Sequence, residues 1–310
     1  MTSIIPLGTS SAMPVPNRHF SSIALQHNGR LLLFDCGEGT QLQFRRARLP
    51  HARVDAIFIT HLHGDHVYGL FGILSTLSLL GHDRPLTIVG PEGVSKLAAG
   101  MPGLQPDKLP YALQYVELSV DFEAGVVFDR PGFQVVAHAI EHTIFAVGYR
   151  FEEKPRPGNL DVERARALGL HHHEAYRKLK QGETVTAPGG RQVKPEEVIG
   201  PAKPGVTFAY VTDSRPCEGG RRLAHAADLV YHEATFEEEH RPRALETGHS
   251  TAREAAEVAR DAGAQRLLLG HFSARYTDTD TLLQEARAVF QNTEAADELN
   301  VYTLASDLPD

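Results

Sequence analysis

Residues 60–66 hold the densest set of chemically active side chains in the sequence. From His61 to His66 they place three imidazoles and one carboxylate in the order H-x-H-x-D-H. The preceding residues, 54–59, are largely apolar and β-branched, which is typical of a buried strand. The cluster therefore follows the C-terminal end of a predicted strand, which is where open α/β sheets bind their ligands.

The spacing within this run lets its side chains face one common space. His61 and His63 are two residues apart, so an extended backbone points both to the same side. Asp65 and His66 are then expected to begin a turn or helix that points back toward them. Imidazole nitrogens and carboxylate oxygens are ligands of zinc and similar divalent ions. A histidine-rich surface turn is the alternative, and it is disfavoured because charged groups seldom crowd a strand end without partners.

Three more ligand-type residues follow strand-like segments elsewhere in the chain. They are His142, Asp213 and His271, and each comes after an apolar run. With the four residues of the first run they make seven candidate ligands at four strand ends. Seven ligands suffice for two four-coordinate metal sites if one carboxylate is shared. Asp213 is the natural bridge, because a carboxylate has two oxygens whereas an imidazole has one free nitrogen.

The elements that must position these residues alternate between short apolar strands and helices. Strands are expected at 4–7, 22–25, 30–34, 56–59, 86–90, 229–231 and just before His271, and helices at 68–80, 91–99, 252–262 and 281–290. Thr251 and Glu254 form a capping-box pattern before the helix at 252–262, and Gly263 is a suitable stop. Two β-rich halves with outer helices predict an α/β fold, a four-layered α/β/β/α sandwich with the ligands along one edge.

Residues 152–204 do not fit this alternation. They are rich in proline and glycine and contain a helical stretch at 161–168. An insertion this long between two strands is uncommon unless it is functional or disordered, so we interpret it as a protruding arm inserted into a single domain of residues 1–310. The three histidines at 171–173 are either a metal-binding tract or solvated surface. Solvated surface is favoured, because no carboxylate–histidine pattern accompanies them.

Charge distinguishes the arm from the rest of the chain. The net charge of −8 argues against nucleic acid as a partner of the whole chain. Residues 150–205 nevertheless hold 11 Lys and Arg against 8 Asp and Glu, so the basic excess lies in one continuous segment. Because Lys and Arg bind phosphate backbones, the segment is either a phosphate-binding surface or an ordinary solvated one.

Composition bears on domain size and compartment. A length of 310 residues with 42% hydrophobic residues suits one large α/β domain with a sizeable core. The sequence lacks an apolar stretch of about 18 residues and a basic N-terminal leader, so we expect neither a membrane span nor a secretory signal. The two cysteines, Cys36 and Cys217, argue against a disulfide framework and for a reducing, cytoplasmic location. For Cys217, a buried neutral thiol is favoured over a contact with the metals near Asp213.

Several motifs resemble the metallo-β-lactamase superfamily and, within it, the tRNase Z family of tRNA 3′-end endonucleases. The H-x-H-x-D-H run and the later His, Asp and His carry the broader resemblance. The narrower one rests on FDCGEGTQ from Phe34, YVTDSRP from Tyr210, HEATF from His232, GHST from Gly248, HFSARY from His271 and, on the arm, KLKQGETV from Lys178. Generic hydrolases of the superfamily share the ligands but lack the arm and the HEAT and GHST runs.

The resemblance implies a centre of two zinc ions per subunit, with manganese as the alternative metal. One ion would bind His61, His63, His142 and Asp213, and the other Asp65, His66, Asp213 and His271. Asp35 would orient a ligand histidine. A metal-activated hydroxide would attack the phosphorus in line, with Asp65 accepting its proton. His249, oriented by Glu233, would protonate the leaving ribose 3′ oxygen.

The implied substrate is precursor tRNA, cut to leave a tRNA 3′ hydroxyl and a trailer with a 5′ phosphate. Contacts with the RNA are expected from Arg18, Lys178, Lys180, Ser250, Ser273 and Arg275, and the arm would act across a homodimer. For Arg275 an ordinary surface ion pair is the alternative. The sequence departs from the family at 173–176, where HEAY replaces a Gly-Pro step before the tyrosine, and in the loop at 13–20.

Two other functions are compatible with the ligand set. A small-molecule hydrolase of the same fold, such as a phosphodiesterase, arylsulfatase or thioester hydrolase, would need the metals but not a basic arm. A non-catalytic RNA-binding member would be expected to have lost metal ligands, whereas this chain keeps all seven. The arm and the pairing of Glu233 with His249 favour the nuclease.

Overall fold

The computed structural model describes residues 2–100 and 108–304, which divide into two compact units. Among the described residues, the larger unit, here called the body, comprises the chain up to Glu152 and again from Val206 to Leu304. The smaller unit, here called the arm, is Glu153–Gly205. In the described part of the chain no helix has the length and apolar character needed to cross a membrane.

The first sheet of the body has seven strands in the order β16-β1-β2-β3-β4-β5-β6. Its strands are β1 (Thr2–Gly8), β2 (Ser22–His27), β3 (Arg30–Phe34), β4 (Val54–Phe58), β5 (Leu86–Pro91), β6 (Leu113–Leu118) and β16 (Tyr302–Leu304). The strands from β3 to β6 run parallel. Parallel strands end at the same edge of a sheet, so the histidine-rich run after β4 lies at that edge.

The second sheet has the order β15-β14-β13-β12-β9-β8-β7. Its strands are β7 (Ala124–Arg130), β8 (Phe133–Ile140), β9 (Ala146–Glu153), β12 (Thr207–Val211), β13 (Leu229–Glu233), β14 (Leu267–Gly270) and β15 (Thr293–Ala295). The strands from β12 to β15 run parallel. The residues that follow β12, β13 and β14 are therefore neighbours at one edge.

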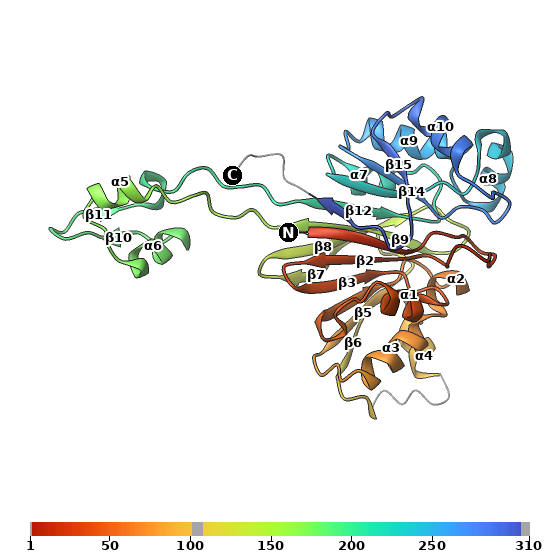
Figure 1. Cartoon of the computed structure of the whole chain (residues 1–310), viewed down its shortest axis with the longest axis horizontal. Coiled ribbons are helices and arrows are strands. Elements are labelled where there is room, and N and C mark those ends of the chain that lie inside the picture. Colours follow the sequence, from red (N-terminus) through yellow and green to blue (C-terminus); the bar gives the residue numbers. More distant parts are fainter. Residues whose placement is uncertain (1, 101–107, 305–310) are drawn as a thin grey trace. The chain divides into compact units, whose positions relative to one another are not determined.

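Helices cover the outer face of each sheet, as Figure 1 shows. On the first sheet they are α1 (Thr40–Arg46), α2 (Gly64–Val67), α3 (Leu70–Leu79) and α4 (Val94–Ala99), and on the second α7 (Glu218–Ala224), α8 (Arg241–Thr247), α9 (Ala252–Asp261) and α10 (Asp280–Arg287). Three buried clusters fill the spaces between the layers: one between the sheets, and one under each set of helices. The predicted four-layered sandwich is confirmed.

The core between the sheets is rich in aromatic side chains. Phe34 stacks on Phe58 with ring centroids 5.1 Å apart, and Tyr149 and Phe208 of the second sheet lie 6.1 and 5.7 Å from Phe34. Buried aromatic side chains contribute large apolar areas, so these contacts fix one sheet against the other. The separation of the two sheets in turn sets the distance between ligands that the two halves of the chain supply.

The predicted helix start at Thr251 is confirmed. The Thr251 hydroxyl accepts the backbone N–H of Glu254 at 3.2 Å, and the Glu254 carboxylate accepts the N–H of Thr251 at 3.0 Å. This reciprocal pair satisfies two N–H groups that the first turn of a helix leaves without partners. Gly263, just beyond the end of α9, has a φ of +68°, which glycine adopts without steric cost.

The arm has its own small core and secondary structure. It contains α5 (Val162–Ala167), α6 (His173–Lys180), β10 (Val185–Thr186) and β11 (Gln192–Val193). The predicted helix at 161–168 is thus present as α5, and the Asp161 carboxylate caps it by accepting the N–H of Arg164 at 2.9 Å. Ala165, Leu170, Leu179, Ala187, Val193 and Val198 are buried together. The three consecutive histidines, 171–173, are exposed.

Candidate metal centre and active site

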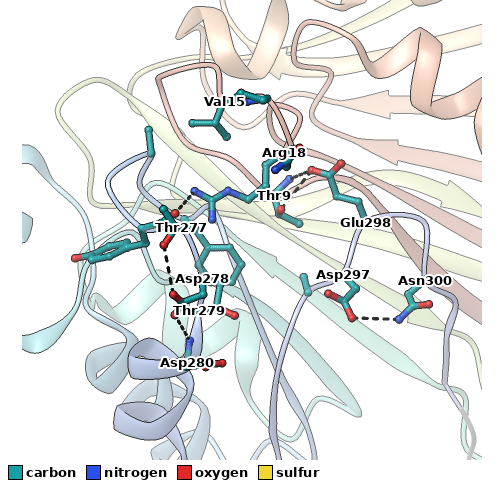
Figure 2. Close-up of a pocket in the computed structure, with 16 residues that line it drawn as sticks. Thr9, Val15, Arg18, Thr277, Asp278, Thr279, Asp280, Asp297, Glu298 and Asn300 are labelled. Atoms are coloured by element: carbon teal, nitrogen blue, oxygen red, sulfur yellow. Dashed lines mark hydrogen bonds between the residues drawn. The ribbon is translucent and has the colours of Figure 1, made fainter.

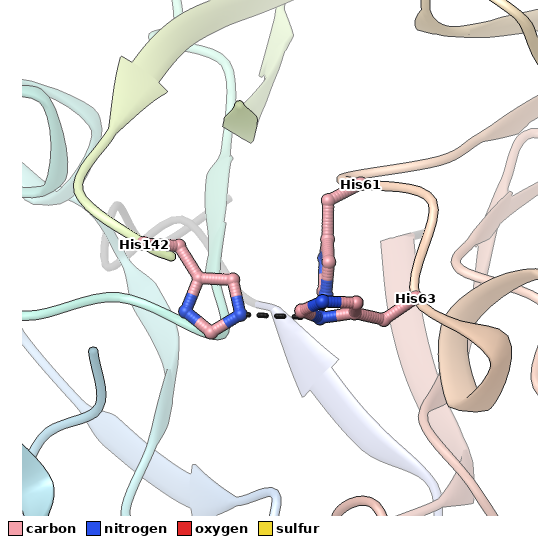
Figure 3. Close-up of side chains that lie close together, drawn as sticks. All are labelled: His61, His63 and His142. Carbon is pink, nitrogen blue, oxygen red and sulfur yellow. Dashed lines mark hydrogen bonds between the residues drawn. The ribbon is translucent and has the colours of Figure 1, made fainter. Parts of the chain in front are cut away.

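The seven predicted ligands meet in one cluster at the edge of the body where the parallel strands end. His61, His63, Asp65 and His66 follow β4, His142 follows β8, Asp213 follows β12 and His271 follows β14. Figure 3 shows His61 and His63 on one segment, with the ring of His142 facing them from another. Groups of three side chains within the cluster bring their ligand atoms within 4.8 Å of one another. The donor set is that of a divalent metal site.

Asp213 lies between two groups of histidines and presents one carboxylate oxygen to each. Its Oδ2 is 3.0 Å from Nε2 of both His66 and His271, and its Oδ1 is 3.8 Å from Nε2 of both His61 and His142. In a tetrahedral site with metal–ligand bonds of about 2.0–2.2 Å, ligand atoms lie about 3.3–3.6 Å apart. The observed 3.0 and 3.8 Å lie on either side of this range, so small side-chain shifts would let each oxygen of Asp213 bind a metal ion together with its histidines.

The remaining distances are compatible with the division of ligands that the family resemblance implies. In one group, Nδ1 of His63 lies 2.9 Å from Nε2 of His61 and 3.3 Å from Nε2 of His142. In the other, Oδ2 of Asp65 lies 3.4 Å from Nε2 of His66 and 3.7 Å from Nε2 of His271. The first group therefore offers three imidazoles, and the second offers two imidazoles and a carboxylate, each completed by Asp213.

Four of the ligand histidines use their second ring nitrogen in a hydrogen bond. Nδ1 of His61, His66, His142 and His271 pairs with Thr60 Oγ1 (3.0 Å), Asp35 Oδ2 (2.7 Å), the Gly248 carbonyl (3.0 Å) and Thr235 Oγ1 (2.9 Å), respectively. Such bonds fix the tautomer and the orientation of a metal-binding ring. The surrounding protein thus determines that Nε2 of these four rings faces the cluster.

Asp35 lies behind the cluster and is fully buried. Its carboxylate accepts hydrogen bonds from the N–H of Thr60 (2.8 Å), from Nδ1 of His66 (2.7 Å) and from the hydroxyl of Tyr210 (2.9 Å). Burial alone would lower the pKa of His66, but the carboxylates of Asp213, Asp35 and Asp65 raise it well above its usual value. The negative charge of these three carboxylates also favours a bound cation beside His66.

We expect Asp35→Asn to weaken metal binding at the His66 site without removing it. The amide keeps the size of the side chain but loses the charge that orients His66, and loss of such a partner typically costs about 10–100-fold in metal affinity. Titration of the metal-stripped protein with Zn²⁺ would measure this, and thermal unfolding of the stripped variant would reveal any general loss of stability. Unchanged affinity for both ions would show that Asp35 serves folding alone.

Three residues of the site have positive φ although none is glycine. Asp35, Asp213 and His271 have φ values of 56°, 47° and 56°. Asp35 and His271 directly follow a strand, and one residue separates Asp213 from the end of its strand. The backbone therefore turns sharply where each side chain enters the cluster. This conformation is uncommon for non-glycine residues, and such strain concentrates at functional sites.

The two predicted proton-transfer residues lie together next to the metal ligands. Glu233, fully buried at the end of β13, places Oε1 3.0 Å from Nδ1 of His249 and accepts the N–H of Ser214 at 2.6 Å with the same oxygen. Nδ1 of His249 is 3.9 Å from Oδ1 of Asp213. Burial alone would lower the pKa of His249, but the Glu233 carboxylate raises it to about 9. The ring is therefore protonated at neutral pH.

His249 and five of the seven predicted metal ligands line one open cavity of about 330 Å³. Its walls include His63, Asp65, His142, Asp213 and His271. Ala12, from the loop that follows β1, closes another side. The cavity thus presents ligand atoms and a protonated imidazole to the same small volume, as hydrolysis of a phosphodiester requires.

Two residues near Asp213 are buried: Ser250, which is close to it in space, and Cys217, which is close to it in sequence. Ser250 has no exposed surface, and its hydroxyl donates to the carbonyl of Ser214 at 2.6 Å. In this structure the Ser250 side chain holds the segment that carries Asp213, and its contact with RNA stays a prediction. Cys217 is also buried, and its sulfur accepts the N–H of Gly220 at 3.4 Å, so the expected buried thiol is confirmed.

The predicted RNA-contact residues of the body make contacts within the protein. Nη2 of Arg18 donates to the carbonyls of Ser273 (3.0 Å) and Tyr276 (2.8 Å). Nε of Arg275 donates to the hydroxyl of Ser273 at 3.1 Å, and its guanidinium lies 4.8 Å from the ring centroid of Phe236. Arg275 thus makes a cation–π contact, whereas its predicted alternative was a surface ion pair.

Sequence reasoning missed Glu298. Its carboxylate accepts the N–H of Thr9 (3.1 Å), the N–H of His19 (2.7 Å) and the side-chain amide of Gln43 (2.9 Å), so it joins both ends of the loop between Thr9 and His19. Figure 2 shows Glu298 and Arg18 in the wall of a pocket of about 740 Å³ beside this loop. A single glutamate outside any motif gives no signal in the sequence.

Comparison with known proteins assigns the chain to a family. Residues 2–97 match the model for anti-Pycsar protein Apyc1, and residues 163–272 match that for a beta-lactamase superfamily domain. The chain is 51% identical over 302 residues to ribonuclease Z of Salinibacter ruber, and this alignment covers 97% of this chain and 94% of the relative. It is 44% identical over 300 residues to ribonuclease Z of Methanothermobacter thermautotrophicus, covering 96% and 95%.

Solved structures agree with this assignment. The structure matches human tRNase Z, short form, with a TM-score of 0.72 and 28% identity over 98% of this chain and 100% of that chain. A metallo-β-lactamase fold protein from Bacillus subtilis, at 18% identity and a TM-score of 0.67 over 97% of this chain and 98% of that one, shares the fold. The resemblance predicted from the motifs is confirmed: with this identity over nearly its whole length, the chain belongs to the ribonuclease Z family of the metallo-β-lactamase fold.

Proposed function

We propose that this member of the ribonuclease Z family removes the 3′ trailer from precursor tRNA, leaving a 3′ hydroxyl on the tRNA and a 5′ phosphate on the trailer. The observation that carries the proposal is the pair of buried Glu233 and partly buried His249, 3.0 Å apart, next to Asp213. A ribose 3′ oxygen is a poor leaving group and needs a proton as it departs. The relatives named ribonuclease Z match the chain over nearly its full length.

The donor set fits two divalent ions, with zinc favoured by its nitrogen and oxygen ligands and manganese as the alternative. One ion would be held by His61, His63, His142 and Asp213, and the other by Asp65, His66, Asp213 and His271. When bound there, the ions supply a nucleophilic hydroxide at neutral pH and offset the charge of the phosphate.

The chain's own residues then divide the proton transfers between them. Burial would raise the pKa of Asp65, but the charge of His66, with hydrogen bonds from His271 and His66, lowers it far below the usual range. Asp65 is therefore ionised in the cavity and placed to accept the proton of the attacking water. His249, kept protonated by Glu233, donates to the 3′ oxygen that leaves.

The decisive experiment is incubation of the purified protein with a 3′-extended precursor tRNA, with and without a chelator, followed by mapping of the product ends. We expect a metal-dependent cut at or near the discriminator nucleotide, with a 3′ hydroxyl on the tRNA. Turnover of a small phosphodiester without any cut in precursor tRNA would overturn the proposal and favour a small-molecule hydrolase.

We propose that the arm binds tRNA phosphates away from the cut. Lys180 on α6 is exposed, and Lys178, half-buried, is 3.6 Å from the Glu174 carboxylate. An exposed ion pair of this kind is weak, so Lys178 remains available to a phosphate. Both side chains lie on the last turns of a helix that the arm's own core supports.

Replacing both Lys178 and Lys180 by alanine is expected to weaken binding to all precursor tRNAs about equally. Each lost phosphate contact reduces the slope of log affinity against log salt by about 0.7–0.9, so the slope should fall by about 1.5. Filter binding at several salt concentrations measures this. The matched control removes two exposed lysines of the body, Lys96 and Lys108, and an equal effect in the control would count against a specific role of the arm.

We propose that the protein forms a homodimer, in which the arm of one subunit serves the site of the other. Large apolar side chains are exposed on or beside α1 and α3: Leu42 (49% exposed), Tyr68 (61%) and Leu79 (87%). Covering such side chains is favourable by about 25 cal/mol per Å² of apolar area. Sedimentation equilibrium gives the mass directly, and a monomer at the concentrations used for the assay would refute this part of the proposal.

A further inference from the structure

Arg215 differs from the other arginines around the metal centre, because its guanidinium has no partner in the part of the chain that the structure describes. Arg18 donates to two carbonyls, Arg275 to a hydroxyl, and Arg241 forms ion pairs with acidic side chains. Within residues 2–100 and 108–304, no hydrogen bond, ion pair or ring contact joins the guanidinium of Arg215 to another side chain or carbonyl. Arg215 is only partly buried, so its charge remains available to a ligand.

The backbone around Arg215 is held in place from two sides. Its N–H donates to the carbonyl of Glu141 at 2.9 Å, directly before the ligand His142. The N–H of the preceding Ser214 donates to Glu233 at 2.6 Å. The Arg215 side chain therefore extends from a backbone segment that is fixed in place, two residues after Asp213. A binding side chain on such a support loses less conformational freedom when its ligand binds.

Arg215 lines two neighbouring cavities, and each includes a residue of the active site. One, of about 300 Å³, also contains His249 and Leu245. The other, of about 600 Å³, contains His142 and Gly248 together with the apolar side chains of Ile144, Phe145 and Leu245. Ile144 is 42% exposed and Leu245 is 54% exposed. A guanidinium beside exposed apolar side chains matches the phosphate and the base of one nucleotide.

We infer that Arg215 and the apolar side chains around it bind the nucleotide on the 5′ side of the cleaved bond, with the guanidinium on its phosphate. This rests on the proposed function. The side is assigned through His249, because the general acid protonates the 3′ oxygen of that nucleotide and both cavities contain His249 or the adjacent Gly248. A nucleotide that fills them therefore lies where the leaving group departs.

The test compares Arg215→Met and Arg215→Lys with the wild-type enzyme. Substrates are precursor tRNA with a long trailer, the same tRNA with a one-nucleotide trailer, and bis(4-nitrophenyl) phosphate. A hydrogen bond to a charged group is worth about 10–100-fold in binding, so we expect Arg215→Met to lower kcat/KM by that factor on both RNAs and by less than about 2-fold on the small diester. Arg215→Lys, which keeps the charge but loses the planar fork, should recover part of the loss.

Arg222→Met is the matched control, since Arg222 is an exposed arginine of the body that pairs with Glu218 on α7. The salt slope should fall by about 0.7–0.9 for Arg215→Met and stay unchanged for the control. An equal loss on all three substrates would overturn the inference by placing Arg215 in support of Asp213. A loss confined to the long trailer would also overturn it, since the site would then bind the trailer. If the proposed function were wrong, the wild-type enzyme itself would not cut either precursor tRNA.

Discussion

Replacing Asp213 by alanine is expected to empty both metal sites at once and abolish RNA cleavage. Among the residues that the structure describes, Asp213 alone has two oxygens that face both groups of histidines, at 3.0 Å on one side and 3.8 Å on the other. Metal ions contribute several kcal/mol to such reactions, so the rate should fall by at least about 10³-fold. Metal analysis after dialysis should find close to no bound ion per chain, compared with about two in the wild type.

Asp213→Asn refines this prediction. The amide offers one ligand atom, its oxygen, because an amide nitrogen does not replace a carboxylate oxygen as a metal ligand. We therefore expect at most one tightly held ion and a comparable loss of cleavage. Asp261→Ala, which removes an exposed aspartate on α9, is the matched control. If the Asp213→Ala protein kept two ions after dialysis, the shared-ligand arrangement would be wrong.

Replacing His249 by alanine is expected to remove proton donation to the leaving group while leaving the metals in place. Nδ1 of His249 lies 3.9 Å from Oδ1 of Asp213, whereas its hydrogen bond to Glu233 is 3.0 Å long. His249 is not among the seven proposed metal ligands, so its loss should leave the distances between Asp213 and the ligand histidines unchanged. General acid catalysis contributes about 10²–10⁴-fold, so kcat on precursor tRNA should fall by that factor. Hydrolysis of bis(4-nitrophenyl) phosphate should be nearly unchanged, because 4-nitrophenolate leaves without a proton.

The contrast between the two substrates is what tests the role of His249. His225→Ala, at an exposed histidine of the body, is the matched control and should behave as wild type on both. Metal analysis of His249→Ala should give the wild-type content. If the variant lost activity equally on precursor tRNA and on the activated diester, His249 would be acting on the metals or on the fold, and the assignment as general acid would be refuted.

The sequence determined much of the fold and the composition of the site, because both are encoded locally. Apolar runs of strand length end at His61, Asp213 and His271, and the ends of parallel strands meet at one edge whatever the details of packing. The capping pattern of Thr251 with Glu254 fixed the start of α9 for the same reason, since its hydrogen bonds join residues three apart. The family motifs added the pairing of Glu233 with His249.

The tertiary structure alone decided how these residues face one another. Asp213 presents one oxygen to His66 and the other to His61, and the Ser250 hydroxyl donates to the Ser214 carbonyl inside the body. Both arrangements depend on how the two sheets pack. Glu298 meets Thr9 across nearly the whole length of the chain. Such contacts join residues far apart in sequence, and neither periodicity nor spacing carries information about them, because they are set by the shapes of the packed layers.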